Sequence, residues 1–195
     1  MIRFLTIGLV LAFSVLQAGD PVEYVGGNSC KMCHKSVEKG NMHALWSETA
    51  HATALATLNS DNALKYAKER GLETAPSESG ECLVCHTTGY GQGGYELLSA
   101  EFIADEANKR AVKKNKNLEN VTCEACHGAG KGYKSKKTMT GIFDGTIEAD
   151  SVGLITPTEE TCRGCHNEKS PGFKEFNYEE RLATIAHPYP EGMRP

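Results

Sequence analysis

The sequence predicts a mainly α-helical fold with long loops and little or no β-sheet. Apolar residues recur at helical spacing in several segments, and no segment shows the alternation that is typical of a strand. Twenty glycines and an aromatic content of 7% leave little material for a conventional core. All eight cysteines lie in four copies of Cys-x-x-Cys-His. We therefore expect one domain that is organised around the groups bound by these motifs.

The first 19 residues have the layout of a secretory signal peptide. Arg3 precedes an apolar run at 4–16, and small residues end the segment at 18–19. The run is short of the roughly 18–20 residues that a spanning helix needs, so a single uncleaved anchor is the weaker alternative. No cysteine follows the run at once, which excludes a lipoprotein anchor. The sequence predicts a signal peptide at 1–19 and a single domain at 20–195 in the periplasm or outside the cell.

Helices are expected on both sides of the second motif. Met42, Leu45 and Trp46 have helical spacing, which predicts a helix over 41–58. A second helix is predicted to begin at a cap by Asp61 and to end at Gly71. Residues 73–81 form an expected polar loop. Residues 89–94 (GYGQGG) predict a tight turn in which the backbone closely approaches a bound group.

Three further helices are predicted in the second half of the chain. Residues 100–117 have helical character, with acidic residues first and basic residues last, which suits the helix dipole. Residues 128–155 are expected to form a glycine- and lysine-rich loop. Residues 156–159 (TPTE) are a helix start with Thr156 as the cap, ahead of the fourth motif. Asn177 is expected to cap a last helix that reaches His187.

The four motifs are attachment sites for c-type haem, in which two thiols form thioethers to the porphyrin and the adjacent histidine binds the iron. The predicted attachment residues are Cys30, Cys33, Cys82, Cys85, Cys123, Cys126, Cys162 and Cys165, and the motif histidines are His34, His86, His127 and His166. Disulfides or zinc would not need a histidine behind every cysteine pair. The sequence therefore predicts four covalently bound haem c groups. The expected fold is a multihaem scaffold wrapped around four stacked haems.

The supply of histidine limits how the irons are ligated. Four haems with two histidines each would need eight, and the chain has seven. We expect His43, His51 and His187 to be distal ligands. On one helix, His43 and His51 would be separated by a rise of about 12 Å and would serve different haems. The remaining axial position is left open, or is filled by a histidine of a second copy, or by a methionine; the candidates are Met32, Met42, Met139 and Met193.

Charge excludes some partners. The formal net charge is −4, and the chain has no nucleic-acid recognition motif, so we expect no nucleic-acid partner. Basic residues cluster at 109–116 and at 131–137. From sequence we interpret these clusters as solvated faces and partners of haem propionates, in preference to docking patches. No catalytic residue is assigned, because the cysteines are occupied by haem and the carboxylates show no catalytic arrangement.

Several segments resemble the cytochrome c-554 family, tetrahaem proteins that accept electrons from hydroxylamine oxidoreductase in ammonia oxidisers. The first motif is followed by Trp46-Ser-Glu-Thr-Ala-His51-Ala52, similar to the segment after the first haem site of the family. The second motif is followed by the glycine-rich turn at 89–95, and residues 121–128 (VTCEACHG) resemble the third site. The order of these segments covers most of the chain beyond the signal peptide.

The resemblance implies roles for individual residues. In the family, three haems have two histidines and the haem of the second motif is five-coordinate. Carried over, Cys82, Cys85 and His86 would hold the open haem, and His51 and His187 would be distal ligands. The family has a further distal histidine shortly after its third motif, whereas residues 128–150 of this chain contain none. His43 lies in an insertion and is the candidate to replace that ligand, in the same molecule or across a subunit contact.

Three functions remain open from sequence. The leading hypothesis is one-electron transfer between redox proteins through closely spaced, mostly bis-histidine haems of low potential. The second is an enzyme that reduces nitric oxide or hydroxylamine at an open iron, with Glu81 or Tyr90 as candidate proton donors. The third is a subunit of an extracellular filament that self-associates through cross-subunit histidine ligation.

Overall fold

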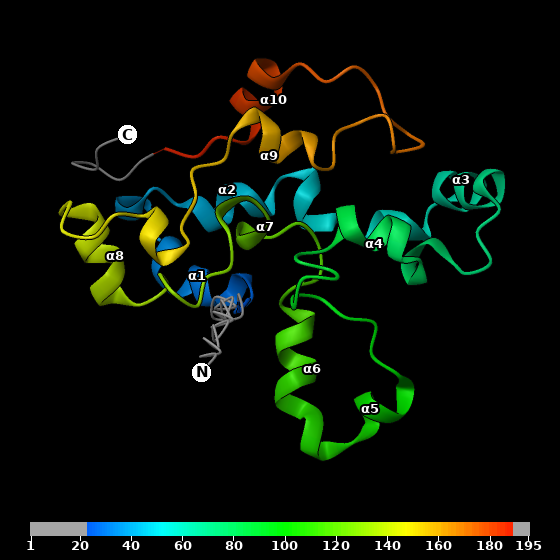
Figure 1. Ribbon diagram of the computed structural model, residues 1–195, viewed down its shortest axis with the longest axis horizontal. Coiled ribbons are helices and arrows are strands. Elements are labelled where there is room, and N and C mark those ends of the chain that lie inside the picture. Colours follow the sequence, from blue (N-terminus) through cyan, green and yellow to red (C-terminus); the bar gives the residue numbers. More distant parts are fainter. Residues whose placement is uncertain (1–22, 189–195) are drawn as a thin grey trace, which may run out of the picture.

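The computed structural model describes residues 23–188, and nearly all regular structure in this range is helical (Figure 1). The one extended pairing among these residues is an isolated bridge between Thr87 and Glu119. The expected mainly α-helical fold is confirmed. The predicted signal peptide at 1–19 and the C-terminal tail from 189 lie outside the described residues. Between 23 and 188, every helix is too short or too polar to cross a membrane.

The α-helices are short, and turns and 3-10 segments join them. They are α1 (Gly27–His34), α2 (Met42–Ser47), α3 (Asp61–Arg70), α4 (Gly80–His86), α5 (Ala100–Ala104), α6 (Lys109–Lys116), α7 (Cys123–His127), α8 (Lys136–Phe143), α9 (Glu159–Arg163) and α10 (Tyr178–Ile185). The 3-10 helices are η1 (Val37–Lys39), η2 (Ala50–Thr53), η3 (Ala56–Asn59), η4 (Pro76–Glu78), η5 (Glu106–Asn108) and η6 (Asp150–Val152).

The helix predicted over 41–58 is interrupted, which corrects the expectation that His43 and His51 share one helix. The α2 helix ends at Ser47, and Thr49 is extended with φ −87° and ψ 159°. The Thr49 hydroxyl donates to the Trp46 carbonyl at 2.8 Å, so its side chain takes up a carbonyl at the end of the helix. His43 lies on α2 and His51 on η2, and the helical rise between them does not apply.

The helix predicted over 100–117 is also divided. Asp105 is extended, and its carboxylate accepts from the Ala107 N–H at 2.9 Å, which starts a new turn. The α5 helix therefore ends before this residue, and the basic residues form α6 by themselves. A single aspartate with a local capping bond is enough to break a segment whose composition favours helix.

Other boundaries follow their caps. Gly71 ends α3 in the left-handed conformation as predicted, but the N-cap is Ser60 and not Asp61. Asn177 caps α10 as predicted, yet that helix ends at Ile185, before His187. The start predicted at Thr156 lies two residues later, because Thr158 and Thr161 form a reciprocal capping box.

Four α-helices were not anticipated. The α1, α4 and α7 helices hold the first three motifs, and the α8 helix lies within the segment that was predicted to be a loop. Ser135 caps α8 by accepting from the Thr138 N–H at 3.0 Å. The helix was not predicted because the segment around it is rich in glycine and lysine, and the weak helix propensity of glycine outweighed the capping signal of Ser135.

The protein core is small, and one of its members, Leu83, lies between the two cysteines of the second motif. It consists of Tyr24, Leu58, Leu83, Tyr95 and Leu118, of which Leu83 and Leu118 are fully buried. The predicted glycine-rich turn closes onto it. Gly89 has φ +71°, and a Cβ there would lie 2.5 Å from the Tyr24 ring. The close approach at this turn is therefore to the Tyr24 ring.

A buried carboxylate joins the N-terminal segment to the third motif. Glu124 is 1% exposed, and its oxygens accept from the backbone N–H groups of Val25 and Gly26 at 2.9 and 2.6 Å. A third bond at 2.6 Å comes from the Gly130 N–H. Because a carboxylate accepts but does not donate, three N–H donors match its ionised form. Glu124 therefore fixes the approach to α1 and the loop after α7 to one point.

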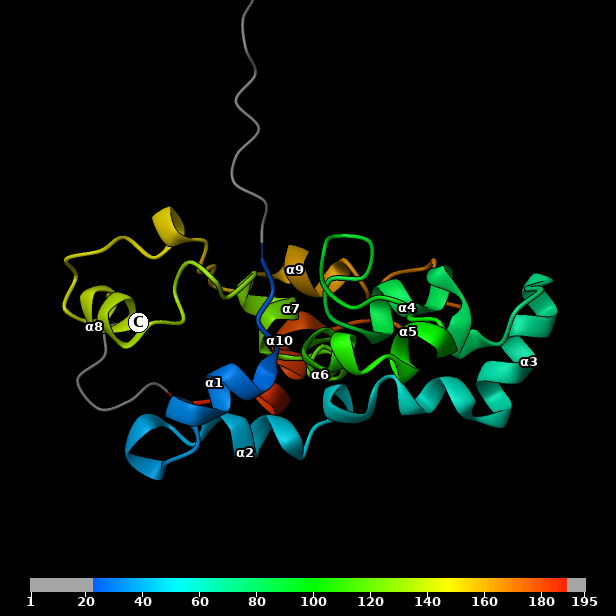
Figure 2. The same ribbon diagram turned by 90° about the horizontal axis from the view of Figure 1, so that it is seen from below.

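The motif helices lie in the middle of an elongated molecule (Figures 1 and 2). The α3 and α8 helices lie at opposite ends in both views. The α5–α6 segment extends away from the rest in Figure 1, next to the described start of the chain. The central position of α1, α4, α7 and α9 brings the four cysteine pairs close together.

Candidate functional site

The four cysteine pairs lie on the central helices. The first three motifs end helices α1, α4 and α7, and the fourth begins on α9 and continues past its end at Arg163. The short helical turn holds the two cysteines and the histidine of each motif on neighbouring positions, since residues three and four apart share a helix face. All eight cysteines lie in the described residues, and none of them forms a disulfide there. Each motif therefore presents two thiols and one imidazole from the same turn.

The thiols of different motifs meet in two pairs. The Cys30 thiol donates to Cys123, and this bond, followed by burial, raises the pKa of Cys30. The Cys165 thiol donates to Cys85, which raises the pKa of Cys165 in the same way. The first motif is therefore next to the third, and the second is next to the fourth. Such contacts between motifs 93 and 80 residues apart cannot be read from their spacing.

The two thiol pairs are joined through the third and fourth motifs. Burial raises the pKa of Cys126 to about 11, and the negative charges of Cys162 and then Cys123 add to this. Cys126 therefore lies near the fourth motif as well as its own. The spatial order of the motifs is first, third, fourth, second.

Two of the three predicted distal histidines lie opposite motif histidines. The His51 and His166 ring centroids are 6.0 Å apart, and those of His127 and His187 are 5.9 Å apart. Two imidazoles that bind one metal ion from opposite sides, each with a metal–nitrogen bond of about 2 Å, have centroids about 6 Å apart. Both pairs have the spacing that a shared iron requires. These contacts place His187 beside the third motif and His51 beside the fourth, and the role of both as distal ligands stays a prediction.

Backbone contacts hold these imidazoles in place. The His127 Nδ1 lies 3.1 Å from the Ile155 carbonyl, and the His86 Nδ1 lies 2.7 Å from the Ala54 carbonyl. An Nδ1–H that donates to a carbonyl leaves Nε2 free as a metal ligand. The Val121 N–H donates to the His51 carbonyl at 3.2 Å, which ties η2 to the strand-like approach to the third motif.

Burial favours the neutral, metal-binding form of several imidazoles. It lowers the pKa of His51, and the neighbouring His166 lowers it further. It also lowers the pKa of His127, with smaller effects from His187 and His34. The Nδ1 atoms of His34 and His187 are buried without a hydrogen-bond partner in the described residues. Within the described residues, these two Nδ1 atoms therefore lack the carbonyl acceptor that orients His127 and His86.

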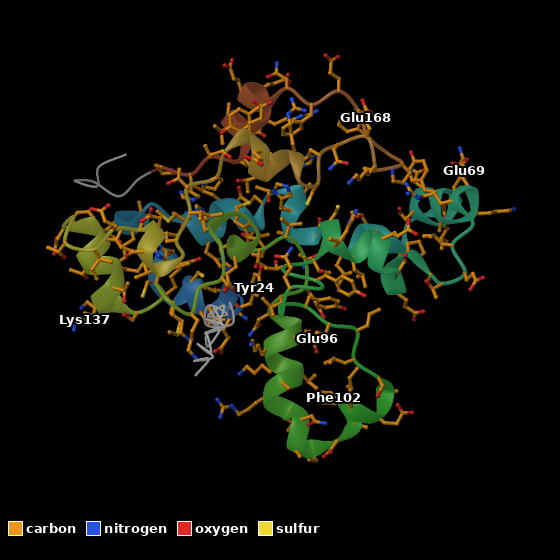
Figure 3. All side chains as sticks on the ribbon, viewed as in Figure 1. Tyr24, Glu69, Glu96, Phe102, Lys137 and Glu168 are labelled. Carbon is orange, nitrogen blue, oxygen red and sulfur yellow. The ribbon has the colours of Figure 1, made fainter. Side chains whose placement is uncertain are left out.

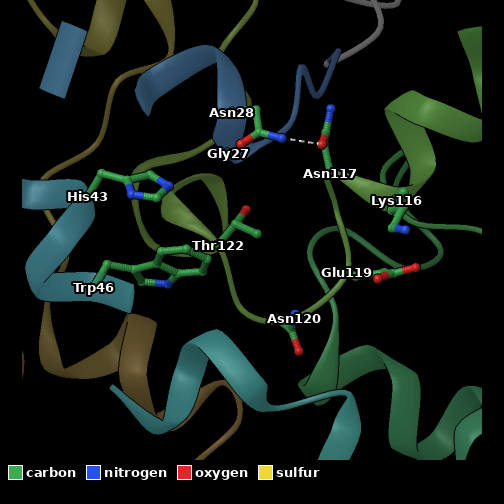
Figure 4. Close-up of a pocket in the computed structure, with 9 residues that line it drawn as sticks. All are labelled: Gly27, Asn28, His43, Trp46, Lys116, Asn117, Glu119, Asn120 and Thr122. Atoms are coloured by element: carbon green, nitrogen blue, oxygen red, sulfur yellow. Dashed lines mark hydrogen bonds between the residues drawn. The ribbon is translucent and has the colours of Figure 1, made fainter. Parts of the chain in front are cut away.

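His43 has a different environment. Its ring lies edge-on to Trp46, with centroids 5.3 Å apart, and faces a cavity of about 120 Å³ (Figure 4). The cavity is lined by Gly27, Asn28, His43, Trp46, Lys116, Asn117, Glu119, Asn120 and Thr122. No ring contact with a motif histidine occurs at His43 within residues 23–188. The role of His43 as a ligand stays a prediction.

The second motif borders an open groove. The groove is lined by Tyr90, Gly91, Gly93, Tyr95, Glu96 and Leu97, and its accessible volume is about 500 Å³. Tyr90 packs against Gly80, the first residue of α4, where a Cβ would lie 3.2 Å from the ring. Glu81, the other candidate proton donor, forms an exposed ion pair with Arg70 at 3.3 Å. Tyr90 therefore lines this groove, whereas Glu81, directly before Cys82, does not.

Some residues of the site carry no signal in sequence. The carbonyl groups of Ala54 and Ile155 act through the backbone, so residue type does not reveal them. Glu124 was not singled out, although a charged residue between two motif cysteines is a usable signal. The carboxylate is buried because its three N–H donors replace water.

Comparisons with known proteins show which family the sequence matches. The family model for cytochrome c554 and c-prime matches residues 29–128, which include the first three motifs. Cytochrome c-554 of Nitrosomonas europaea is 29% identical over 167 residues, which cover 77% of this chain and 60% of that protein. The chain thus spans less than two thirds of this relative's length.

A solved structure is similar in fold. The reduced state of cytochrome c554 from Nitrosomonas europaea matches with a TM-score of 0.57 and 24% identity, covering 83% of this chain and 82% of that one. At this identity the likeness concerns the fold. It confirms the mainly helical scaffold with almost no strand that the sequence predicts.

Proposed function

Because the chain belongs to the cytochrome c554 and c-prime family, which implies covalently bound haem c, we propose that it is an exported tetrahaem electron carrier. It exchanges single electrons with redox protein partners in the periplasm or outside the cell. Each motif holds one haem through its two thioethers, and the motif histidine is the proximal ligand. The redox chemistry itself belongs to the haem iron, whose potential depends on its ligands and surroundings.

The order of the motif thiols is the observation that carries this proposal. Cys30 meets Cys123, Cys126 is near Cys162, and Cys165 meets Cys85. Attachment sites in such a continuous series suit electron transfer from one end of the molecule to the other. An enzyme that uses one haem would not need all four sites to adjoin.

The polypeptide sets the ligation and the surroundings of each site. His187 and His51 supply the second axial nitrogen at the third and fourth sites, which favours low potentials there. The Ile155 and Ala54 carbonyls orient His127 and His86 through Nδ1. Glu124 adds a buried negative charge between the first and third sites, which favours the oxidised form of nearby iron.

The test is the intact mass of the processed protein, followed by a reductive titration. We expect the mass of the chain that begins near residue 19 or 20 plus four haem groups, and four electrons taken up per molecule. A mass with fewer haems, or fewer than four electrons, would contradict the tetrahaem carrier.

A second candidate function is reduction of a small molecule at the second site. It is favoured because no second histidine ring contacts His86 within residues 23–188, and because a groove with Tyr90 borders that motif. Carbon monoxide should then bind one of the four reduced haems, and Tyr90→Phe should slow turnover of nitric oxide or hydroxylamine. Absence of carbon monoxide binding would eliminate this candidate and leave the carrier unaffected.

A further inference from the structure

Positive charge is concentrated in one part of an acidic chain. Residues 109–137 contain nine lysines and arginines against two glutamates, a formal charge of +7 in a chain of −4. The rest of the chain is therefore strongly negative. From sequence alone, the two basic runs in this range were interpreted as separate solvated faces. The structure brings them together.

The two runs meet around one carboxylate. The Glu23 side chain lies 3.0 Å from Lys131 Nζ and 3.9 Å from Lys114 Nζ. The hydrogen bond and charge of Lys131 lower the pKa of Glu23, and Lys114 and Lys134 lower it further. The Lys131 N–H also donates to the Glu23 carbonyl at 3.2 Å. In Figure 1 the described start of the chain lies between α6, which carries Lys114, and α8, which follows Lys131 and Lys134 in the chain.

One carboxylate cannot balance this cluster. We call the basic residues of both runs, all exposed except the half-buried Lys114, the basic face: Lys109, Arg110, Lys113, Lys114, Lys116, Lys131, Lys134, Lys136 and Lys137. Arg110 and Lys114 are four residues apart and share one side of α6. Arg110, Lys134 and Lys137 have no ion-pair partner in the described part of the chain. Figure 3 shows Lys137 projecting outward from α8.

The 131–137 part of the basic face lies beside the first and third motifs, whereas α6 extends away from the rest of the molecule in Figure 1. Tyr133, between Lys131 and Lys134, is buried, and its hydroxyl donates to the Gly128 carbonyl at 2.7 Å, directly after His127. Burial raises the pKa of Tyr133, and the nearby Cys30 and Glu124 raise it further. The loop that carries these lysines is therefore packed on the attachment thiols of two predicted haems.

We infer that the basic face is the docking surface for an acidic redox protein, which exchanges electrons with this chain at the first and third motifs. This inference rests on the proposed electron-carrier function. Opposite charge accelerates encounter, and the negative remainder of the chain repels the same partner, so the partner is oriented. A location beside attachment sites suits a partner that passes electrons, whereas a lipid surface would gain nothing from it.

The test uses the haem-loaded protein and reduced flavodoxin, an acidic one-electron donor, as the probe. The variant carries Arg110→Glu, Lys134→Glu and Lys137→Glu, which leaves both ion pairs to Glu23 intact. The matched control carries Lys68→Glu, Lys169→Glu and Lys174→Glu, which makes the same charge change on exposed residues beside α3 and α9. The haem absorption spectrum and circular dichroism verify that both proteins are folded.

We expect the second-order rate of haem reduction at low ionic strength to fall at least tenfold in the variant and less than twofold in the control. The salt dependence of the rate should also flatten only in the variant. Reduction by photoreduced lumiflavin, an uncharged donor, should be equal in all three proteins. Equal flavodoxin rates in variant and control, with normal lumiflavin rates, would overturn the docking surface.

Two other outcomes separate the alternatives. Failure of lumiflavin to reduce the wild-type protein would instead overturn the electron-carrier function. Wild-type binding to phosphatidylglycerol vesicles that the variant loses, together with an unchanged flavodoxin rate, would assign the basic face to an anionic lipid surface and overturn the inference.

Discussion

The third and fourth motifs differ from the first and second in what lies opposite their histidines. His127 and His166 each have a second imidazole at about 6 Å, whereas His34 and His86 have no such ring contact within residues 23–188. The motifs themselves are alike in sequence. The difference teaches that a Cys-x-x-Cys-His motif specifies where a haem is attached, while a distant segment specifies how its iron is ligated.

The strongest way to break this comparison is to remove a distal histidine. His187→Ala should convert the third site from low spin to high spin, and His51→Ala should do the same at the fourth, because each iron loses one axial nitrogen. Paramagnetic resonance of the oxidised protein measures this as one low-spin iron lost of the four proposed. Each variant should also gain one carbon monoxide site after reduction.

His43→Ala is the informative control for these variants. Its ring faces the cavity beside Trp46, away from the two matched histidine pairs. If the variant keeps the wild-type number of low-spin irons and the wild-type mass in solution, His43 is a ligand neither within the molecule nor across a subunit contact. Loss of a low-spin iron in dilute monomer would assign His43 to a site in its own chain, and the first site is then the candidate.

A smaller effect is expected from removing the Glu124 carboxylate, which joins the N-terminal segment before the first motif to the third motif. Glu124→Ala leaves three buried or part-buried N–H groups without an acceptor, which should cost on the order of 3 kcal/mol of unfolding free energy. Thermal unfolding of the haem-loaded protein should show a midpoint lower by about 10 °C. Glu124→Gln keeps one acceptor oxygen and should lose less.

Glu73→Ala is the matched control for Glu124→Ala, since Glu73 is exposed and forms no ion pair in the described residues. Its midpoint should stay within about 2 °C of wild type. Equal midpoints for the two alanine variants would mean that the buried carboxylate does not hold the N-terminal segment to the third motif.

The smallest effect concerns how the motif helices begin. The α9 helix starts with the Thr158–Thr161 capping box, whereas α1 starts at Gly26 without a side-chain cap. Thr158→Ala should therefore destabilise the fourth-motif region by about 1 kcal/mol, detected by hydrogen exchange at the amides of 161–166. The same experiment should show unchanged protection in α1. Reduced protection in both helices would indicate a global effect and not loss of a cap.

Much of the site was predictable because covalent chemistry is local. Cys30–His34 and its three counterparts are recognisable from five consecutive residues. The end of α3 follows from the left-handed Gly71, and the start of α10 follows from the capping side chain of Asn177. Local signals failed where competing ones were close together. Thr49 and Asp105 each broke an expected helix, and Ser135 started one inside an expected loop.

The sequence by itself determined the kind of fold, the family and the attachment chemistry proposed at each motif, because these depend on residue type and short spacing. Only the tertiary structure decided which motifs adjoin, which histidines face each other, and that two basic runs form one face around Glu23. These are long-range facts: Cys30 meets Cys123 and His51 meets His166 because intervening turns fold back. The free energy of such contacts includes the entropy cost of closing the long loops between distant residues, and no short stretch of residues encodes it.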